Sequence, residues 1–135
     1  MSSLVSIDEI RAAAARLDGV AFRTPLVPFP GSDPRLLLKT ESLQPTGSFK
    51  LRGAYAAISA LPAQVRARGV VAHSSGNHAW AVAYAAARLG VPATVVVPDN
   101  APPVKLDPVR RLGAQIVTTE PSLTCLLYTS DAADE

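Results

Sequence analysis

The chain has 135 residues, of which 48% are hydrophobic and 18% charged, so it fits one ordinary globular domain and is not a disordered chain. Its net charge of +2 is too small to favour nucleic-acid binding, and no apolar run approaches the roughly 20 residues that span a bilayer. We expect a cytoplasmic protein, since the N-terminus does not read as a signal peptide, and the single Cys125 excludes a disulfide within the chain.

The first half of the chain predicts two helices and two extended segments. Residues 6–9, Ser-Ile-Asp-Glu, form a capping box, and apolar residues at helical spacing follow it. Residues 23–26 are expected to be extended, because the residue before a proline disfavours the helical region. Residues 36–40 predict a short buried strand. A second helix is predicted from Ser48, which is expected to cap it, and Pro62 closes it.

The second half alternates strands and helices. Its elements are predicted in the order strand 69–73, helix 78–89, strand 93–97, helix 103–112 and strand 114–117. The second of these helices is expected to restart at Asp107-Pro108, where Asp can cap and Pro suits a first turn. Continuously apolar strands separated by helices predict an α/β fold with a parallel sheet covered by helices. Ligands in such folds bind beyond the C-terminal ends of the strands.

Lys50 stands in the stretch TGSFKLRGA, in the first turn of the second predicted helix. The positive end of the helix dipole and burial both favour a neutral amine, the form that attacks a carbonyl to make a Schiff base. Phe49 could supply a packing wall beside it. A solvated lysine at a helix start is the alternative, and Lys50 taken alone does not decide between the two.

The loop HSSGNHA, residues 73–79, follows a predicted strand and opens a helix, where backbone N–H groups can hold an anion. Gly76 permits a tight turn and close approach of a ligand. More polar side chains are present than a helix cap needs, and they are Ser74, Ser75, Asn77 and His78. We expect the ligand of this loop to be a carboxylate. His73 is expected to be mainly structural, and two histidines without an acidic cluster predict no metal site.

These two loops carry a resemblance to a known family. ESLQPTGSFKLRGA, residues 41–54, resembles the pyridoxal-phosphate attachment signature of the serine/threonine dehydratase family. SSGNHA, residues 74–79, is similar to that family's substrate-carboxylate loop. Further matches are RTPL at 23–26, GVPATVVVP at 90–98 and the Lys105…Arg110…LGA pattern. Trp80 and Pro108 depart from the family, and Trp80 stands where a small or amide residue is usual, either packing the helix or reshaping the pocket.

The resemblance implies the fold and a role for each matching residue. The fold would be the three-layer, tryptophan-synthase-β-like architecture called fold type II. Lys50 would form a Schiff base with pyridoxal phosphate and act as the base on the substrate Cα proton, with Phe49 packed near the cofactor. Asn77 would hydrogen-bond the phenolic oxygen of the cofactor ring. The substrate carboxylate would be held by Ser74, Ser75, Asn77 and His78.

The implied activity is that of a serine/threonine ammonia-lyase, which removes the β-hydroxyl and ammonia from a hydroxy amino acid to give a 2-oxo acid. Serine racemase, where the position of Ser75 serves as the opposite-face acid or base, and hydroxyaspartate ammonia-lyase are alternatives. A β-replacement synthase is disfavoured, because those enzymes usually carry a Thr-containing loop in place of residues 74–78. The implied partners are a small amino acid substrate and further copies of the whole protein, with no nucleic acid or membrane.

The resemblance also implies a division of the chain. Residues 1–68 would begin a large cofactor domain, and residues 69–124 would form an incomplete small substrate domain. Residues 125–135, CLLYTSDAADE, match a translated sequencing adapter and are predicted to be a non-native tail in place of the natural continuation. The family is more than twice as long and carries its phosphate-binding glycine loop later in the sequence. A catalytically silent α/β fragment is therefore the non-enzyme alternative.

Overall fold

The computed structural model describes residues 4–31, 33 and 35–120. Helix α1, Ile7–Arg16, begins with the predicted capping box, in which the Ser6 hydroxyl accepts from the Glu9 N–H at 3.2 Å and the Ser6 N–H donates to the Glu9 carboxylate at 2.7 Å. The apolar face of α1 is exposed, with Ile7 at 58% and Ile10 at 53%. The sequence periodicity therefore predicts this helix correctly, although none of its residues is buried in the described structure.

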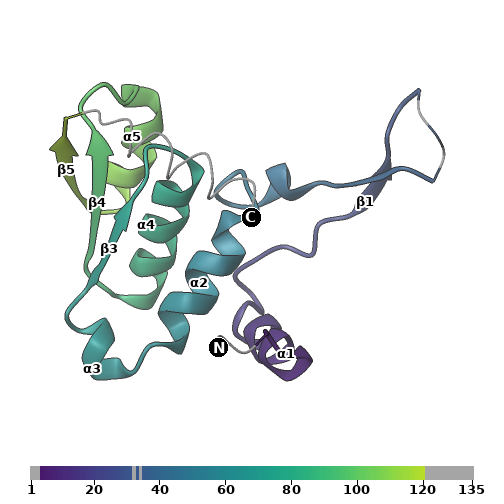
Figure 1. Cartoon of the computed structure of the whole chain (residues 1–135), viewed down its shortest axis with the longest axis horizontal. Coiled ribbons are helices and arrows are strands. Elements are labelled where there is room, and N and C mark those ends of the chain that lie inside the picture. The colour runs from purple at the N-terminus through teal and green to yellow at the C-terminus, as the bar shows by residue number, and fades with distance from the viewer. Residues whose placement is uncertain (1–3, 32, 34, 121–135) are drawn as a thin grey trace.

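Strands β1, Leu26–Pro28, and β2, Leu37–Lys39, pair antiparallel in a hairpin. Figure 1 shows the hairpin projecting from the end of the molecule, away from the other sheet and its helices. The strand expected at 36–40 is confirmed, but its predicted burial is wrong, because every β2 residue is exposed. An apolar sequence shows which residues favour burial but does not supply the surface that buries them. Within the described residues, no element packs over the apolar side chains of β2.

A short 3-10 helix, η1 at Glu41–Leu43, leads into α2 at Lys50–Ala60, which is followed by α3 at Ala63–Arg66. The prediction that Ser48 caps α2 is wrong. Phe49 is the N-cap residue, already has helical backbone angles, and no side chain caps the helix. Helix α2 buries Leu51 and the residues one and two turns beyond it.

The α/β alternation is confirmed. Strands β3, Val70–His73, β4, Ala93–Pro98, and β5, Gln115–Thr119, form a parallel sheet in that order, with α4, Asn77–Leu89, and α5, Pro103–Arg111, between them. Helix α5 does not restart at Asp107-Pro108; it continues through Pro108, and Asp107 pairs with Arg110 at 3.2 Å instead of capping. Within the described ranges, no helix is long and apolar enough to cross a membrane.

One face of this sheet carries the core. Val95 and Val97 of β4 are fully buried against α4 and α5, and α2 packs on the other side of α4 (Figure 1). The opposite face is open, with Val71 exposed at 75% and Val117 at 41%. The predicted covering by helices is therefore found on only one face of the described sheet.

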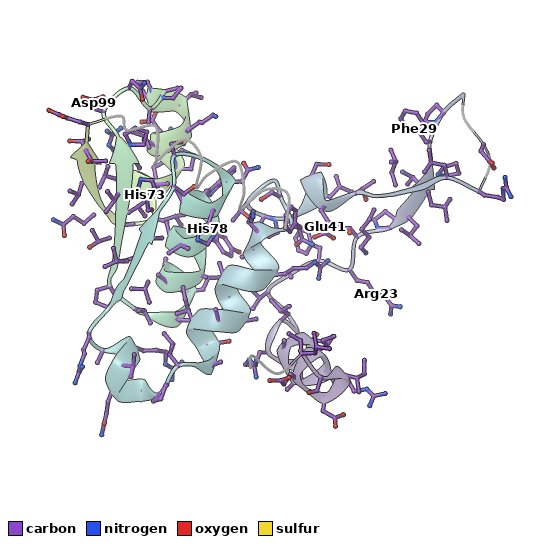
Figure 2. The ribbon with its side chains drawn as sticks, viewed as in Figure 1. Arg23, Phe29, Glu41, His73, His78 and Asp99 are labelled. Atoms are coloured by element: carbon purple, nitrogen blue, oxygen red, sulfur yellow. The ribbon has the colours of Figure 1, made fainter. Side chains whose placement is uncertain are left out.

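A polar network joins η1 to α2 where the hairpin meets the helices, as the position of Glu41 in Figure 2 illustrates. Arg52 donates from Nε and Nη2 to the two carboxylate oxygens of Glu41, each at 2.8 Å. Thr24 Oγ1 donates to the same carboxylate at 2.6 Å, and Gln44 Nε2 does so at 3.2 Å. The Gln44 amide also pairs with the backbone N–H and C=O of Phe22, at 2.9 and 2.8 Å. We call these five residues the Glu41 network.

The Glu41 network makes folding stability depend on acid. Hydrogen bonds from Arg52 lower the pKa of Glu41 from 4.5 to about 2, against a smaller opposing effect of burial. Because this folded-state pKa lies below the unfolded value, the stabilisation is complete above pH 4.5 and is lost as the pH falls towards 2.

We expect Glu41→Gln to lower the free energy of unfolding at pH 7 by about 1–3 kcal/mol and to flatten its fall below pH 4.5, since the ion pair is removed. Urea unfolding followed by circular dichroism at several pH values measures both effects. Asp107→Asn is the matched control, because its ion pair with Arg110 is half exposed and should change stability by less than about 0.5 kcal/mol. Equal effects of the two substitutions would contradict the assignment.

Candidate active site

Lys50 is the first residue of α2 and its side chain is half-buried. Its Nζ lies over the ring of Phe49, 5.0 Å from the ring centroid, a distance at which an ammonium is attracted to an aromatic face. The packing wall that the sequence suggested is therefore present. Phe49 is 54% exposed, so the aromatic residue beside the amine remains accessible.

The turn before Lys50 contains two buried hydroxyls. Gly47 has a φ of +68°, a conformation that favours glycine, and its N–H donates to Gln44 O at 2.8 Å. On either side of it, Thr46 Oγ1 and Ser48 Oγ are buried and make no hydrogen bond to the described residues. Because an unsatisfied buried hydroxyl costs about 1–3 kcal/mol, two of them at one turn indicate a place where polar atoms of a ligand or of further chain belong.

The second loop ends at an open helix terminus. Ser74 is buried, and its hydroxyl accepts from the Gly76 N–H at 3.2 Å. Gly76 is the N-cap of α4, and no side chain caps this helix, so the polar side chains of the loop do not serve as its caps. The Trp80 N–H donates to Gly76 O at 3.3 Å as the first bond of the helix. The N–H groups of residues 77–79 thus lack acceptors within α4, and such an end attracts an anion.

The structure brings the two loops together. Burial, followed by the charge of Lys50, lowers the pKa of His78 below 6.5, so the imidazole is neutral at pH 7. The effect of Lys50 requires the two side chains to lie near one another. A second link is the indole of Trp80, whose Cζ3 would lie 3.7 Å from a Cβ built on Gly47. The lysine-bearing turn and the first turn of α4 are therefore neighbours.

Asn77 and His78 point to different cavities on the two sides of α4. His78 lines an open groove of about 470 Å³ between α2 and β3, which His73 also lines from the end of β3 (Figure 2). Asn77 lines a cavity of about 160 Å³ together with Trp80 and Lys105. His73 ends its strand as expected and is exposed. Within the described ranges, no group of three or more His, Cys, Asp or Glu residues could hold a metal ion.

Part of the predicted site comes together at the adjoining ends of α2 and α4, whereas Asn77 lines the cavity on the other side of α4. Lys50, Phe49 and His78 are linked by the interactions above, Ser74 is buried, Ser75 is half-buried and Asn77 is exposed. The sequence interpretation missed the Glu41 network and the contact of Trp80 with Gly47. The signal for the first was available, since an acid and an arginine flank the TGSFK stretch. The contact of Trp80 had no local signal.

Comparison with known proteins decides the family. The family model described as "Pyridoxal-phosphate dependent enzyme" matches residues 17–134. The chain belongs to this family. The cofactor and the fold type expected from the two loops are thereby confirmed for the family. The residue roles stay predictions.

Three relatives illustrate where this pyridoxal-phosphate enzyme chain stands. It is 45% identical to L-threonine ammonia-lyase of Thermotoga maritima over 84% of its own length and 29% of that protein. It is 45% identical to L-threo-3-hydroxyaspartate ammonia-lyase of Pseudomonas sp over 84% of its length and 37% of that protein. The solved structure of maize serine racemase superposes with a TM-score of 0.84 at 38% identity, covering 98% of this chain and 42% of that one. The chain therefore spans about a third of the length of these curated relatives.

The site of this pyridoxal-phosphate enzyme chain fits its cofactor on structural grounds. A half-buried lysine amine suits an aldehyde, and the open end of α4 suits an anionic group. The two unsatisfied hydroxyls of Thr46 and Ser48 offer further polar contacts next to Lys50. These features are independent of one another and meet at the same pair of helix ends.

The electrostatic link between the loops can be measured in the cofactor-free protein. We expect Lys50→Gln to raise the pKa of His78 towards 6.5 without reaching it, because the lysine charge is removed while burial remains. Nuclear magnetic resonance titration of the imidazole protons measures this pKa. Lys105→Gln, which removes a charge from the other side of α4, is the control and should leave it unchanged. An unchanged pKa in Lys50→Gln would mean that the two loops lie apart.

Proposed function

We propose that the whole protein carrying this sequence is a pyridoxal-phosphate-dependent ammonia-lyase that converts serine, threonine or a related hydroxy amino acid to a 2-oxo acid. The observation that carries the proposal is the approach of the turn before Lys50 to the uncapped, polar first turn of α4. The names of the relatives from Thermotoga maritima and Pseudomonas support the same reaction class. Hydroxyaspartate is therefore kept as a third substrate.

Each side chain at this place has a chemical role in the proposal. Lys50 would hold the cofactor through its amine and then move the Cα proton of the substrate. The open N–H groups of α4, with Ser74 and Ser75, would bind the substrate carboxylate and orient its Cα–H bond. His78, neutral at pH 7, can donate a hydrogen bond to a carboxylate without adding a full charge. Asn77 would contact the cofactor ring from the first turn of α4.

The bound cofactor supplies the electron sink that makes Cα deprotonation accessible. Loss of the Cα proton would be followed by breakage of the Cβ–O bond, and the departing hydroxide would take up one proton, which balances the one lost from Cα, to leave as water. Hydrolysis returns one water and releases ammonia, so the net products are the 2-oxo acid and ammonia. The residues of this chain contribute binding, orientation and proton transfer at Cα.

The division of the chain is also proposed. Residues 1–68 would contribute to a larger cofactor domain, which is supported by the exposed apolar side chains of the β1–β2 hairpin, since such a two-stranded ribbon is at best marginally stable alone. Residues 69–124 would belong to a smaller substrate domain, whose described sheet still has an open apolar face. The tail at 125–135 lies outside the described residues. Its origin, the homo-oligomer and the cytoplasmic location stay predictions from the sequence.

The first test is removal of the amine. We expect Lys50→Ala in the whole protein to abolish the cofactor absorbance band near the visible edge and to remove 2-oxo acid release from serine, threonine and hydroxyaspartate, since no other group replaces the Schiff-base nitrogen. Lys50→Arg keeps the positive charge and should fail equally. Arg11→Ala, on the exposed surface of α1, should retain both signals. Activity that survives in Lys50→Ala would overturn the mechanism, and a wild-type protein without the band would favour the silent-fragment alternative.

A second candidate function, serine racemase, is supported by the half-buried Ser75 in the polar loop and by the maize structure. Racemisation needs a proton donor on the face opposite Lys50, so Ser75→Ala should reduce conversion of L-serine to D-serine by at least about tenfold more than it reduces 2-oxo acid release. Chiral chromatography and a 2-oxo acid assay on the same samples measure the two rates. If both fell equally, Ser75 would serve substrate binding alone.

A further inference from the structure

We propose that Trp80 is a positioning residue, which fixes the lysine-bearing turn of α2 against the first turn of α4. The inference rests on the proposed function to the extent that the site holds pyridoxal phosphate. Trp80 lies outside both the polar loop at 73–79 and the lysine stretch at 46–54, and the proposed function gives it no role. Trp80 is also the only tryptophan in this sequence.

One side of the Trp80 side chain packs against the hydrophobic core between the sheet and its helices. Trp80 is in the first turn of α4, three residues after Asn77, and its side chain packs against the buried cluster that includes Val95 and Val97 of β4 and Val109 of α5. A large, rigid side chain with only two rotatable bonds keeps its orientation when one part of it is held by such a core. The position of the indole is thus set by the sheet and α5.

The other side of the indole meets the turn that carries Lys50. A Cβ on Gly47 would lie 3.7 Å from Trp80 Cζ3, which is van der Waals contact, so the ring fills the space directly beside the Gly47 backbone. Gly47 has a φ of +68°, and its two neighbours are buried, so the turn has a defined shape for the ring to contact. Lys50 begins α2 three residues later.

Trp80 therefore connects the core of the sheet to the lysine turn through one rigid side chain. It also lines the 160 Å³ cavity with Asn77, so that its removal would enlarge the space beside a proposed cofactor ligand. The Glu41 network holds the same turn from its other end, but it includes no residue of α4. Trp80 thus places its indole beside Gly47 at the end of the α2–α4 interface nearest the loop expected to bind the carboxylate.

The test compares cofactor affinity with stability in the whole protein. We expect Trp80→Ala to weaken pyridoxal phosphate binding by about tenfold, measured by spectroscopic titration of the cofactor-free protein well below its melting temperature. Leu112→Ala is the matched control, because Leu112 is also half-buried against the same core cluster, and it should lower the melting temperature while changing affinity less than about twofold. We expect cofactor affinity to fall in the order wild type, Trp80→Phe, Trp80→Leu, because a leucine side chain does not reach the position of Cζ3.

The outcomes separate this inference from the proposed function. A wild-type protein without a Lys50-dependent absorbance band would overturn the proposed function and this inference with it. A wild-type protein that binds the cofactor, together with a Trp80→Ala variant of unchanged affinity, would overturn the role of Trp80 alone. If Trp80→Ala does not fold, Trp80→Leu decides in its place, because leucine keeps apolar contact with the core but loses Gly47. Equal affinity in Trp80→Leu and the wild type would reject the proposal.

Discussion

The bidentate ion pair between Glu41 and Arg52 is the constraint on which the rest of the candidate site depends. It spans eleven residues of sequence and closes the segment that contains the lysine turn. A charge-assisted, bidentate pair has a defined geometry as well as strength, and the partial burial of both side chains reduces its screening by solvent. With both ends of the segment held, the turn at Gly47 has far fewer conformations available, and the amine of Lys50 starts from a fixed helix end.

The electrostatic character of the site follows from the position of Lys50 at the start of α2. The N-terminal ends of α2 and α4 meet there, and both lack a side-chain cap. Each carries partial positive charge, and Lys50 adds another. Burial and this charge keep His78 neutral at pH 7. A place with two open helix ends and a cation, but no carboxylate among the predicted site residues, is suited to anionic ligands. A substrate carboxylate has that property, which agrees with the carboxylate that the polar loop is expected to bind.

The sequence predicted the elements well where the physical signal is local. The capping box at Ser6 and the apolar strands each follow from neighbouring residues, and the structure has them. The location of the site was also predictable, because loops after parallel strands converge. The predicted burial of 36–40 was wrong because an apolar sequence does not by itself supply a packing partner, and none covers this strand within the described residues. The cap at Ser48 failed because Phe49 already has helical angles.

The proximity of Trp80 to Gly47 was missed because it joins residues distant in sequence through shape. Gly47 and Trp80 come from different halves of the chain, and their contact depends on how closely α2 approaches α4. That approach is set by small side chains, since the face of α4 that packs with α2 consists largely of alanine. Bulkier residues there would move the helix axes apart, and the distance between Lys50 and His78 would grow with them. The chemistry of the site therefore rests on an alanine-lined helix interface as much as on its polar residues.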